Sequence, residues 1–502
     1  MLLLTCRITW LYLLLVPSFA FAQTGDPPNI IYILADDMGY GDLKSLNAAS
    51  QIPTPHMDQL VQEGVHFTDA HTNSAVCTPT RYGILTGRYA FRTHLKQGVL
   101  WGYSPALIEP ERATVATFLQ DQGYHTACIG KWHLGLDWVK QDPQQEIKDV
   151  KWNDRVPQGY QDNVDYSQPV SNGPANHGFD YSLIIPASLD MSPYCYLRNN
   201  VVVQPPTAYT EGKSQEADGR GVFWREGKVS PSFDFDRVLP TLVDSACAYV
   251  KRRASQADPF FLYLPLPAPH TPWLPTEAHH DRSEAGRYGD FVTMVDAMVG
   301  QVMQTVAENG LTENTLIIVT SDNGADWNPE DQKQYAHRAN HIYKGRKADI
   351  YEAGHRVPFV ARWPGVIPAG QRSNQIMCST DLMATLAGML NASVAETAGE
   401  DSENLWPAFI GTDRAPIREE IVHHSLRGVF SIRQGKWKYT PHRGSGGFTE
   451  PVTIAPNPGE PSGTLYDLEA DPREEHNLYE KYPDKVAELA EQLKKYQENN
   501  TP

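Results

Sequence analysis

Long apolar runs and cysteine are both scarce in this sequence, and each shortage argues against a class of protein. After the first 22 residues no apolar stretch is long enough to cross a bilayer, so we expect no membrane span in the mature chain. Six cysteines occur in 502 residues. None of them forms a Cys-x-x-Cys pair, which argues against a zinc site built from thiolates. No internal repeat is visible.

Positive charge is also in short supply. The chain has 43 Lys and Arg residues against 60 Asp and Glu residues, which gives a formal net charge of −17 at pH 7. Binding to nucleic acid needs a basic surface, so this composition argues against a nucleic-acid partner. It argues less against a sulfated polymer, because a few local Arg and Lys side chains can bind anions within an acidic protein.

The first 22 residues have the pattern of a secretory signal peptide. The basic Arg7 precedes an apolar run at Ile8–Val16, and small residues at Ala20 and Ala22 mark the expected cleavage point. A retained N-terminal anchor is the alternative. We expect the mature protein in the periplasm or outside the cell.

Removal of this segment would take Cys6 away and leave an odd number of cysteines. The five that remain are Cys77, Cys128, Cys195, Cys247 and Cys378. An odd count in an exported protein leaves at least one cysteine unpaired. The sequence does not indicate how the others pair.

Apolar strands alternate with amphipathic helices along most of the chain. Examples are strands at Ile30–Leu34, 259–272 and 315–324. This alternation predicts an α/β fold with a large, mostly parallel central sheet flanked by helices. Past about residue 415 the pattern changes to short strands that we expect to be antiparallel, followed by a helix. We therefore predict a catalytic domain over residues 23–414 and a smaller C-terminal α+β subdomain over residues 415–502.

Polar side chains follow two of the predicted strands. Asp36 and Asp37 end the first strand, and Asp322 and Asn323 follow a strand almost three hundred residues later. Ligands bind at the carboxyl edge of open α/β sheets, and a set of carboxylate and amide oxygens suits a hard cation such as Ca²⁺ or Mg²⁺. Ordinary turn chemistry is the alternative for each pair taken alone.

Four motifs occur in order along the chain. The stretch "CTPTRYGILTGR" has the pattern C-x-P-x-R…T-G-R, and "GYHTACIGKWHLG" has the pattern G-Y-x-T-x-x-x-G-K-x-H. The segment "GRKADIYEAGHRVP" carries Ala353 where the related pattern E-G-G-x-R-V-P has glycine, and "TLYDLEADPREEHNL" lies near the end. Together they resemble the type I sulfatases, formylglycine-dependent enzymes of the alkaline phosphatase-like superfamily. The resemblance covers nearly all of the mature chain.

The resemblance implies a sulfuric ester hydrolase and a set of site residues. Cys77 would be oxidised to Cα-formylglycine by a formylglycine-generating enzyme during maturation. Its hydrated aldehyde would attack sulfur with one hydroxyl and expel sulfate with the other. The implied catalytic residues are Cys77, Arg81, Lys131, His133, His270 and Lys347. The implied ligands of Ca²⁺, with Mg²⁺ the lesser candidate, are Asp36, Asp37, Asp322, Asn323 and residue 77.

Two spacings support these roles. Arg81 lies one helical turn after Cys77 and should face the same side. Lys131 and His133 lie two apart on a stretch that we expect to be extended, so they should also point the same way. Ser188 matches a serine that contacts sulfate in the family, although the match is weaker.

The substrate is predicted from the loops around the pocket, because the core motifs bind only sulfate and metal. The segment "PASLDMSPYCYLRNNVVV" resembles one in bacterial sulfatases that act on the 6-O-sulfate of galactose or N-acetylgalactosamine. Candidate sugar contacts are Asp190, Tyr194, Arg198, His423 and His424. A purely structural loop is the alternative for this segment. The alternatives for the function are a sulfatase for another glycan position, a phosphodiesterase or phosphonate hydrolase, and a non-catalytic sulfoglycan-binding protein.

Overall fold

The computed structural model describes residues 26–149, 151 and 159–498. The predicted signal peptide and Cys6 lie outside these residues. Helices occur at α1 (Pro55–Glu63), α2 (Cys77–Thr86), α3 (Val115–Asp121), α4 (Gln215–Asp218), α5 (Val238–Arg253), α6 (Gly286–Glu308), α7 (Pro329–Gln334), α8 (Glu352–His355), α9 (Leu382–Leu390), α10 (Trp406–Phe409) and α11 (Pro483–Glu498).

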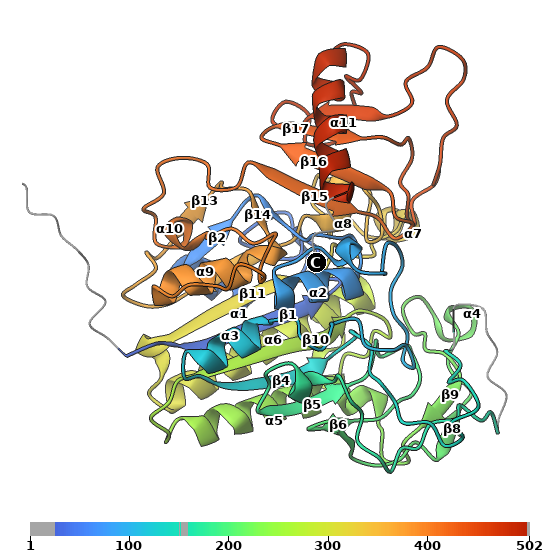
Figure 1. Cartoon of the computed structure of the whole chain (residues 1–502), viewed down its shortest axis with the longest axis vertical. Helices are drawn as coiled ribbons and strands as arrows, with labels where there is room; N and C mark the ends of the chain where they lie inside the picture. Colours follow the sequence, from blue (N-terminus) through green and yellow to red (C-terminus); the bar gives the residue numbers. More distant parts are fainter. Residues whose placement is uncertain (1–25, 150, 152–158, 499–502) are drawn as a thin grey trace, which may run out of the picture.

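A ten-stranded sheet runs through the centre of the molecule (Figure 1). Its strands, in spatial order, are β13 (Gln371–Ser373), β2 (Val65–Phe67), β12 (Phe359–Arg362), β11 (Thr315–Ser321), β1 (Asn29–Asp36), β10 (Phe260–Pro269), β4 (His125–Lys131), β5 (Tyr181–Ile185), β6 (Leu197–Arg198) and β7 (Val201–Val202). Two pairs lie outside it: β3 (Ala70–His71) with β14 (Met377–Cys378), and β8 (Ala208–Thr210) with β9 (Gly227–Val229).

The middle of the sheet is parallel and its flanks are largely antiparallel. Strands β11, β1, β10, β4 and β5 all run in one direction, with Ile31 of β1 paired to Leu262 on one side and Ile317 on the other. Strands β12, β6 and β7 pair antiparallel to their neighbours. The predicted parallel α/β sheet is confirmed for the five central strands. Because these strands are parallel, their carboxyl ends lie at one edge of the sheet.

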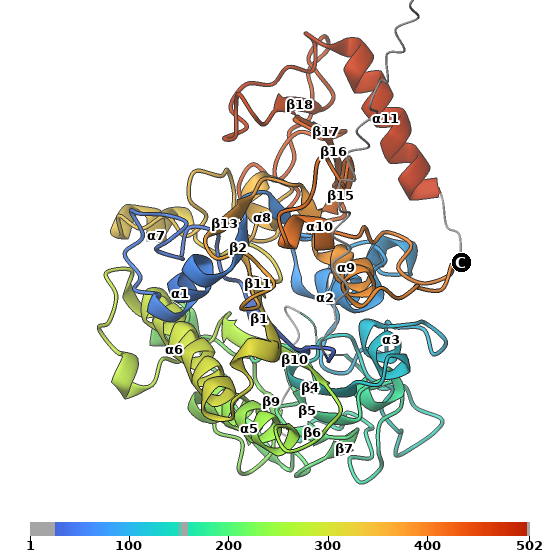
Figure 2. The ribbon, with the colours of Figure 1, turned by 90° about the vertical axis from the view of Figure 1, so that its left-hand side faces the viewer.

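Both faces of the sheet are covered, which explains why its central strands are continuously apolar. Alternate side chains of β1 enter two different cores: Tyr32 lies in the core of one face and Ile33 in the core of the other. Helices α2, α3 and α9 cover the first face, and α1, α5 and α6 cover the second (Figure 2).

The C-terminal part has a sheet of its own. Its antiparallel strands are β15 (Glu420–His424), β16 (Phe430–Gln434), β17 (Trp437–Thr440) and β18 (Thr464–Asp467). Helix α11 packs Val486, Leu489 and Leu493 against this sheet (Figure 1). The short antiparallel strands and the closing helix were both expected from the sequence. The domain boundary at residue 414 stays a prediction.

The described residues bear on two questions from the sequence, which are whether the cysteines form disulfides and whether a helix could cross a membrane. All five cysteines there are buried and free, so the structure pairs none of them. Within the same residues, no helix has both the length and the apolar character that a bilayer crossing requires.

Candidate active site

The carboxyl ends of four central strands bring polar side chains to one edge of the sheet. β1 ends at Asp36 and is followed by Asp37, β4 ends at Lys131, and His270 follows β10. Asp322 follows β11 and lies alongside β1, since its backbone N–H donates to the carbonyl of Ala35 (3.1 Å). The expected meeting of these side chains is therefore present.

Helix α2 places Cys77 at this edge. The helix runs from Cys77 to Thr86 and is capped by Gly87, whose φ of 64° lets its N–H donate to the carbonyl of Gly83. Every residue of α2 is buried. Burial raises the pKa of the Cys77 thiol to about 11, so the unmodified side chain would stay protonated and be a poor nucleophile at neutral pH.

Arg81, one turn further along α2, holds the carboxylates together. Its Nε and Nη2 donate to Oδ2 of Asp322 at 3.0 and 2.6 Å. Nη2 lies 3.6 Å from Oδ1 of Asp36. Arg81 therefore faces the site, on the same side as Cys77, and is fully buried.

Two lysines and a histidine surround the first two aspartates. Nζ of Lys131 donates to Asp36 (2.7 Å), and Nζ of Lys347 donates to Oδ2 of Asp37 (2.9 Å). Although burial opposes its charge, the Asp37 carboxylate raises the pKa of Lys347 well above its ordinary value. Nε2 of His270 lies 3.8 Å from Oδ2 of Asp37.

Lys131 and His133 do not share an extended segment, which corrects the expected spacing argument. β4 ends at Lys131, and His133 has a φ of 56°, so the chain turns between them. Nε2 of His133 contacts the carbonyl of Leu100 (2.8 Å), while its Nδ1 is buried without a hydrogen-bond partner. Burial, together with the charge of Lys131, lowers the pKa of His133 well below its ordinary value and leaves a neutral ring.

The acidic cluster fits a hard divalent cation. Oδ1 of Asp36 and Oδ1 of Asn323 are buried without hydrogen-bond partners, which is costly unless something else satisfies them. An oxygen of Asp36, an oxygen of Asp322 and Sγ of Cys77 all lie within 4.8 Å of one another. Burial and the charge of Asp36 raise the pKa of Asp322, a repulsion that a bound cation would remove. Carboxylate and amide oxygens are the ligands that Ca²⁺ prefers.

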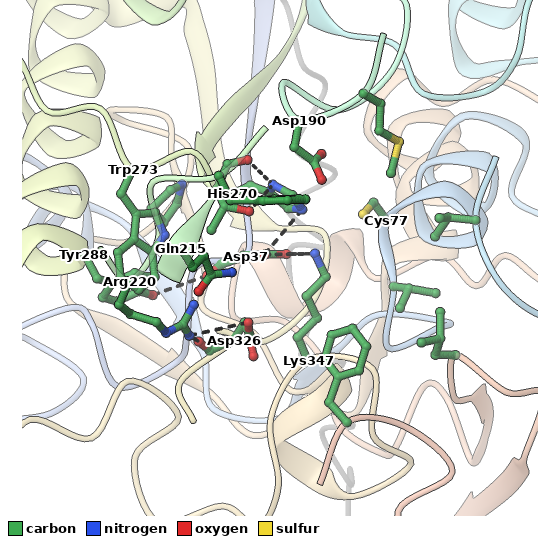
Figure 3. A pocket seen from close by; sticks show the side chains of 18 of the residues that line it. Asp37, Cys77, Asp190, Gln215, Arg220, His270, Trp273, Tyr288, Asp326 and Lys347 are labelled. Atoms are coloured by element: carbon green, nitrogen blue, oxygen red, sulfur yellow. Dashed lines mark hydrogen bonds and ion pairs between the residues drawn. The ribbon is translucent and has the colours of Figure 1, made fainter. Parts of the chain in front are cut away.

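A cavity lies beside this cluster, and Asp37 and Cys77 line it (Figure 3). Four of the side chains that line the cavity point into the same part of it: Cys77, His270, Lys347 and Asp190. Ser188 stands beside them, because its hydroxyl lies 3.3 Å from both Nζ of Lys131 and Nδ1 of His270. Of the predicted sugar contacts, only Asp190 lines this cavity.

The other four predicted sugar contacts are placed elsewhere. Tyr194 is buried, and its hydroxyl donates to the carbonyl of Arg225. Arg198 is exposed on β6, near the far edge of the sheet. His423 and His424 are fully buried on β15 and do not line the cavity. Tyr194, His423 and His424 are therefore packed in the interior and Arg198 lies on the surface, which corrects the assignment of all four to the pocket wall.

The cavity also contains residues that the sequence motifs did not reveal. Arg225 donates to Asp190 and stacks over the rings of Trp101 and Phe223. Arg220 donates to Asp331 and lies over Trp273 in the opposite wall. Nothing in the sequence pattern links Arg225 to an aspartate 35 positions earlier, because loop packing alone brings them together.

Known proteins that are similar to this chain along nearly its whole length are sulfatases. The sulfatase family model matches residues 28–392. An N-acetylgalactosamine-6-O-sulfatase of Bacteroides thetaiotaomicron is 32% identical over 505 residues, covering 94% of this chain and 93% of that protein. Human arylsulfatase A is 31% identical over 503 residues, covering 97% of this chain and 90% of the human one.

A solved structure is similar in fold over the same length. It comes from work on the metabolism of multiple glycosaminoglycans by Bacteroides thetaiotaomicron and shares 30% identity with this chain. The superposition has a TM-score of 0.79 and covers 94% of this chain and 100% of that one.

Proposed function

The chain belongs to the sulfatase family and is a sulfuric ester hydrolase, and we propose that it removes the 6-O-sulfate of N-acetylgalactosamine or galactose units in a sulfated carbohydrate. The observation that carries the proposed site is the position of Cys77. It lies at the start of α2, in the cavity wall, with Sγ within 4.8 Å of the oxygens of Asp36 and Asp322. The relative named for N-acetylgalactosamine-6-O-sulfate supports the proposed sugar.

Cys77 is the precursor of the nucleophile in this proposal. A formylglycine-generating enzyme oxidises it to Cα-formylglycine, whose hydrate supplies one hydroxyl to attack sulfur and a second to expel sulfate. The high pKa of the thiol supports the need for this change, because an un-ionised thiol is a weak nucleophile.

Asp36, Asp37, Asp322 and Asn323 would hold the Ca²⁺ ion together with residue 77. A bound cation polarises the sulfate group and makes a hydroxyl beside it easier to deprotonate. Arg81 positions the carboxylates, since it donates twice to Asp322 and approaches Asp36.

The remaining polar side chains manage charge and protons. Lys131 and Lys347 neutralise the sulfate oxygens. Nδ1 of His270 lies 2.6 Å from the carbonyl of Thr271, which fixes that nitrogen as a donor. The proton for the departing sugar hydroxyl therefore comes from Nε2 of the protonated ring. His133, neutral and with an unpartnered Nδ1, accepts the proton of the second hydroxyl.

Asp190 is the proposed contact to the sugar. Its Oδ2 is held by Arg225, whereas its Oδ1 is buried without a hydrogen-bond partner beside the cavity. A sugar hydroxyl would satisfy that oxygen, and the paired arginine keeps the carboxylate ionised and in place.

The test is a substrate panel with enzyme whose residue 77 is confirmed as formylglycine by mass spectrometry. We expect sulfate release from 6-O-sulfated N-acetylgalactosamine or galactose and less from 4-O-sulfated N-acetylgalactosamine. Cys77→Ala protein is the control and should release none. Turnover confined to other sugars would refute the substrate, and faster hydrolysis of phosphodiester or phosphonate esters would refute the proposed reaction.

We also propose that the chain is exported, to the periplasm or out of the cell, with cleavage after Ala22. The support is the apolar segment preceded by Arg7 in the sequence. N-terminal sequencing of the protein from its native host tests this, and a mature chain that still begins at Met1 would contradict it.

A further inference from the structure

The proposed cation ligands lie on two loops, and a third stretch of chain contacts both of them. The first ligand segment (residues 36–42) continues from β1, and the second ligand segment (residues 322–325) continues from β11. The two strands pair in register only as far as Ala35 and Ser321. Beyond that point residues 337–340, the supporting segment, hydrogen-bond to each ligand segment from outside the cavity.

Asn340 of the supporting segment binds the backbone of the second ligand segment. Its Oδ1 accepts from the N–H of Ala325 (2.9 Å), and its Nδ2 donates to the carbonyl of the same residue (3.0 Å). That carbonyl also accepts from the backbone N–H of Lys347 (3.1 Å). Asn340 therefore fixes the loop that follows Asn323 at a point that also contacts the backbone of a proposed sulfate-binding lysine.

The amide of Asn340 also lies between glycines of the two ligand segments. A Cβ placed on Gly39 would lie 3.0 Å from Oδ1 of Asn340, and a Cβ placed on Gly324 would lie 3.1 Å from the same atom. The absence of a side chain at both positions leaves room for the amide between the two loops. Asn340 is buried. Its side chain is thus placed to set the distance between the segments.

His337 of the supporting segment holds the first ligand segment through Asp42. Nδ1 of His337 accepts from the N–H of Gln51 (3.3 Å), so Nε2 carries the hydrogen and donates it to Oδ1 of Asp42 (2.8 Å). Oδ2 of Asp42 accepts from the N–H of Gly39 (2.7 Å). Both His337 and Asp42 are fully buried. Their hydrogen bonds fix the turn that follows the first ligand pair.

The charges of the ligands give this support a physical reason. Three carboxylates converge at the proposed cation site, and without an ion they repel one another. An asparagine amide and a neutral imidazole can hold the two loops through hydrogen bonds without adding charge. Ca²⁺ binds its oxygen ligands at about 2.3–2.6 Å, so its affinity depends on how accurately the two loops are spaced.

We propose that Asn340 and His337 are positioning residues for the cation site, which hold the first and second ligand segments at the spacing that Ca²⁺ requires. This inference rests on the cation site proposed above. Neither side chain lines the cavity, so each acts through the loops that it holds. Removing either one should weaken Ca²⁺ binding while every proposed ligand is still present.

The test is the affinity of the mature enzyme for Ca²⁺, measured by isothermal titration calorimetry after treatment with a chelator. We expect the dissociation constant to rise about 10–100-fold in Asn340→Ala and in His337→Ala, the range found when groups that support metal ligands are removed. His337→Gln should keep most of the affinity, because the glutamine amide can still donate a hydrogen bond to Asp42.

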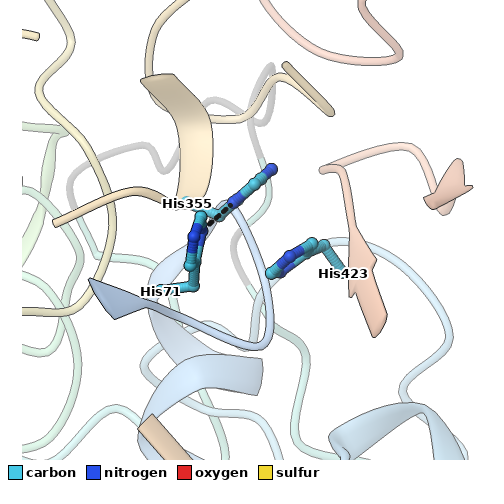
Figure 4. Close-up of side chains that lie close together, drawn as sticks. All are labelled: His71, His355 and His423. Carbon is cyan, nitrogen blue, oxygen red and sulfur yellow. Dashed lines mark hydrogen bonds between the residues drawn. The ribbon is translucent and has the colours of Figure 1, made fainter. Parts of the chain in front are cut away.

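Two control variants separate this effect from a general loss of stability. Asn200→Ala removes a buried asparagine between β6 and β7 that also makes two side-chain hydrogen bonds, at a φ of 67° that alanine adopts at a cost. His423→Ala removes a fully buried histidine that stacks on His355 (ring centroids 3.7 Å apart) near His71, outside the cavity (Figure 4). Both controls should lower the melting temperature and leave the dissociation constant for Ca²⁺ unchanged.

The rise in melting temperature on adding Ca²⁺ is a second readout, which serves for a variant too unstable for calorimetry. Asn340→Ala should need a higher Ca²⁺ concentration than the wild type for the same rise. Wild-type affinity in Asn340→Ala and His337→Ala, or an equal loss in the two controls, would overturn the proposal and leave the cation site intact. A wild type that binds no Ca²⁺ would refute the cation site itself, and this inference with it.

Discussion

In the candidate active site each buried aspartate pairs with a basic side chain of its own, so a dense group of ionised side chains can stay buried. Lys131 pairs with Asp36, Lys347 with Asp37, and Arg81 with Asp322. Although burial favours the protonated acid, the charges of Lys131 and His270 hold the pKa of Asp36 well below its ordinary value. Oδ1 of Asp36 and Oδ1 of Asn323 have no hydrogen-bond partner and remain available to a cation. Because the charged side chains have separate partners, single substitutions at His270 and Lys347 should distinguish proton transfer from sulfate binding.

His270→Asn should reveal proton donation to the leaving group. Sugar alcohols are poor leaving groups that need a proton, whereas an activated aryl alcohol departs without one. We expect kcat/KM for a 6-sulfated sugar to fall about 10²–10⁴-fold and that for an activated aryl sulfate to fall much less. Lys347→Met is the comparison, because loss of sulfate stabilisation should lower both rates alike. Equal losses on both substrates in His270→Asn would contradict the role.

Asp190→Ala should reveal sugar recognition. The change removes the acceptor offered to a sugar hydroxyl and the ion pair between that carboxylate and Arg225. We expect kcat/KM for the 6-sulfated sugar to fall about 10–100-fold, the equivalent of one lost hydrogen bond to a charged group, with little change for a small aryl sulfate. Steady-state kinetics on both substrates measure this. A uniform loss on both would indicate a structural role instead.

At the scale of elements, the N-terminus of helix α1 is capped by a side chain of helix α6 and not by the residue that precedes α1. Thr54 precedes α1 but makes no side-chain cap. The carboxylate of Asp296, in the middle of α6, accepts from the N–H groups of His56 (3.2 Å) and Met57 (2.8 Å) instead. The N-terminus of α1 is therefore fixed by its packing on α6.

Asp296→Asn should change how stability depends on pH. Burial raises the pKa of Asp296 to about 6, above that of an unfolded aspartate, so the folded state binds this proton more tightly. The stability from that proton is present below about pH 4 and is lost as the pH rises through about 6. Asparagine keeps the acceptor and does not titrate. The melting temperature of the variant, relative to wild type, should therefore be higher at pH 7.5 than at pH 4.5.

Asp121→Asn is the control for this comparison, because Asp121 is an exposed aspartate at the end of α3. Its melting temperature relative to wild type should be the same at both pH values. If Asp296→Asn behaved like this control, the proposed proton uptake at Asp296 would be wrong.

At the scale of the whole molecule, buried ion pairs connect the C-terminal sheet to the segments around the site. Lys438 of β17 contacts Glu352 of α8 and Glu474, and Arg433 of β16 contacts Asp69. Except for Asp69, whose side chain is 16% exposed, these groups are almost fully buried. These pairs join the C-terminal part to the segments that carry Asp69 and Glu352, both of which also pair with Arg356.

Lys438→Met should destabilise the folded chain by about 3–5 kcal/mol, because it leaves Glu474 buried without its ion-pair partner and removes one of the two cations that contact Glu352. Denaturant unfolding followed by fluorescence measures the loss. Lys436→Met is the control, since Lys436 pairs with Asp467 near the surface with 40% of its side chain exposed, and its unfolding curve should shift little. Matching curves for the two variants would contradict the view that the buried pairs join the two parts.

The sequence by itself predicted the central strands, the helical turn between Cys77 and Arg81, and the meeting of Asp36, Asp37, Asp322 and Asn323 at one sheet edge. These predictions succeed because parallel strands must deliver their carboxyl ends to the same side, and the motifs lie directly at those ends. The motifs and their order along the chain were enough to identify the family, while the catalytic roles of the individual residues stay predictions.

Only the tertiary structure decided which loop residues reach the cavity and which meet elsewhere. Arg225 joins Asp190, while Arg198, His423 and His424 are placed away from the cavity. His71, His355 and His423 come together from three segments that share no motif. Strand ends follow from topology, but loop contacts depend on side-chain packing between segments hundreds of residues apart. No local pattern in the sequence records that packing.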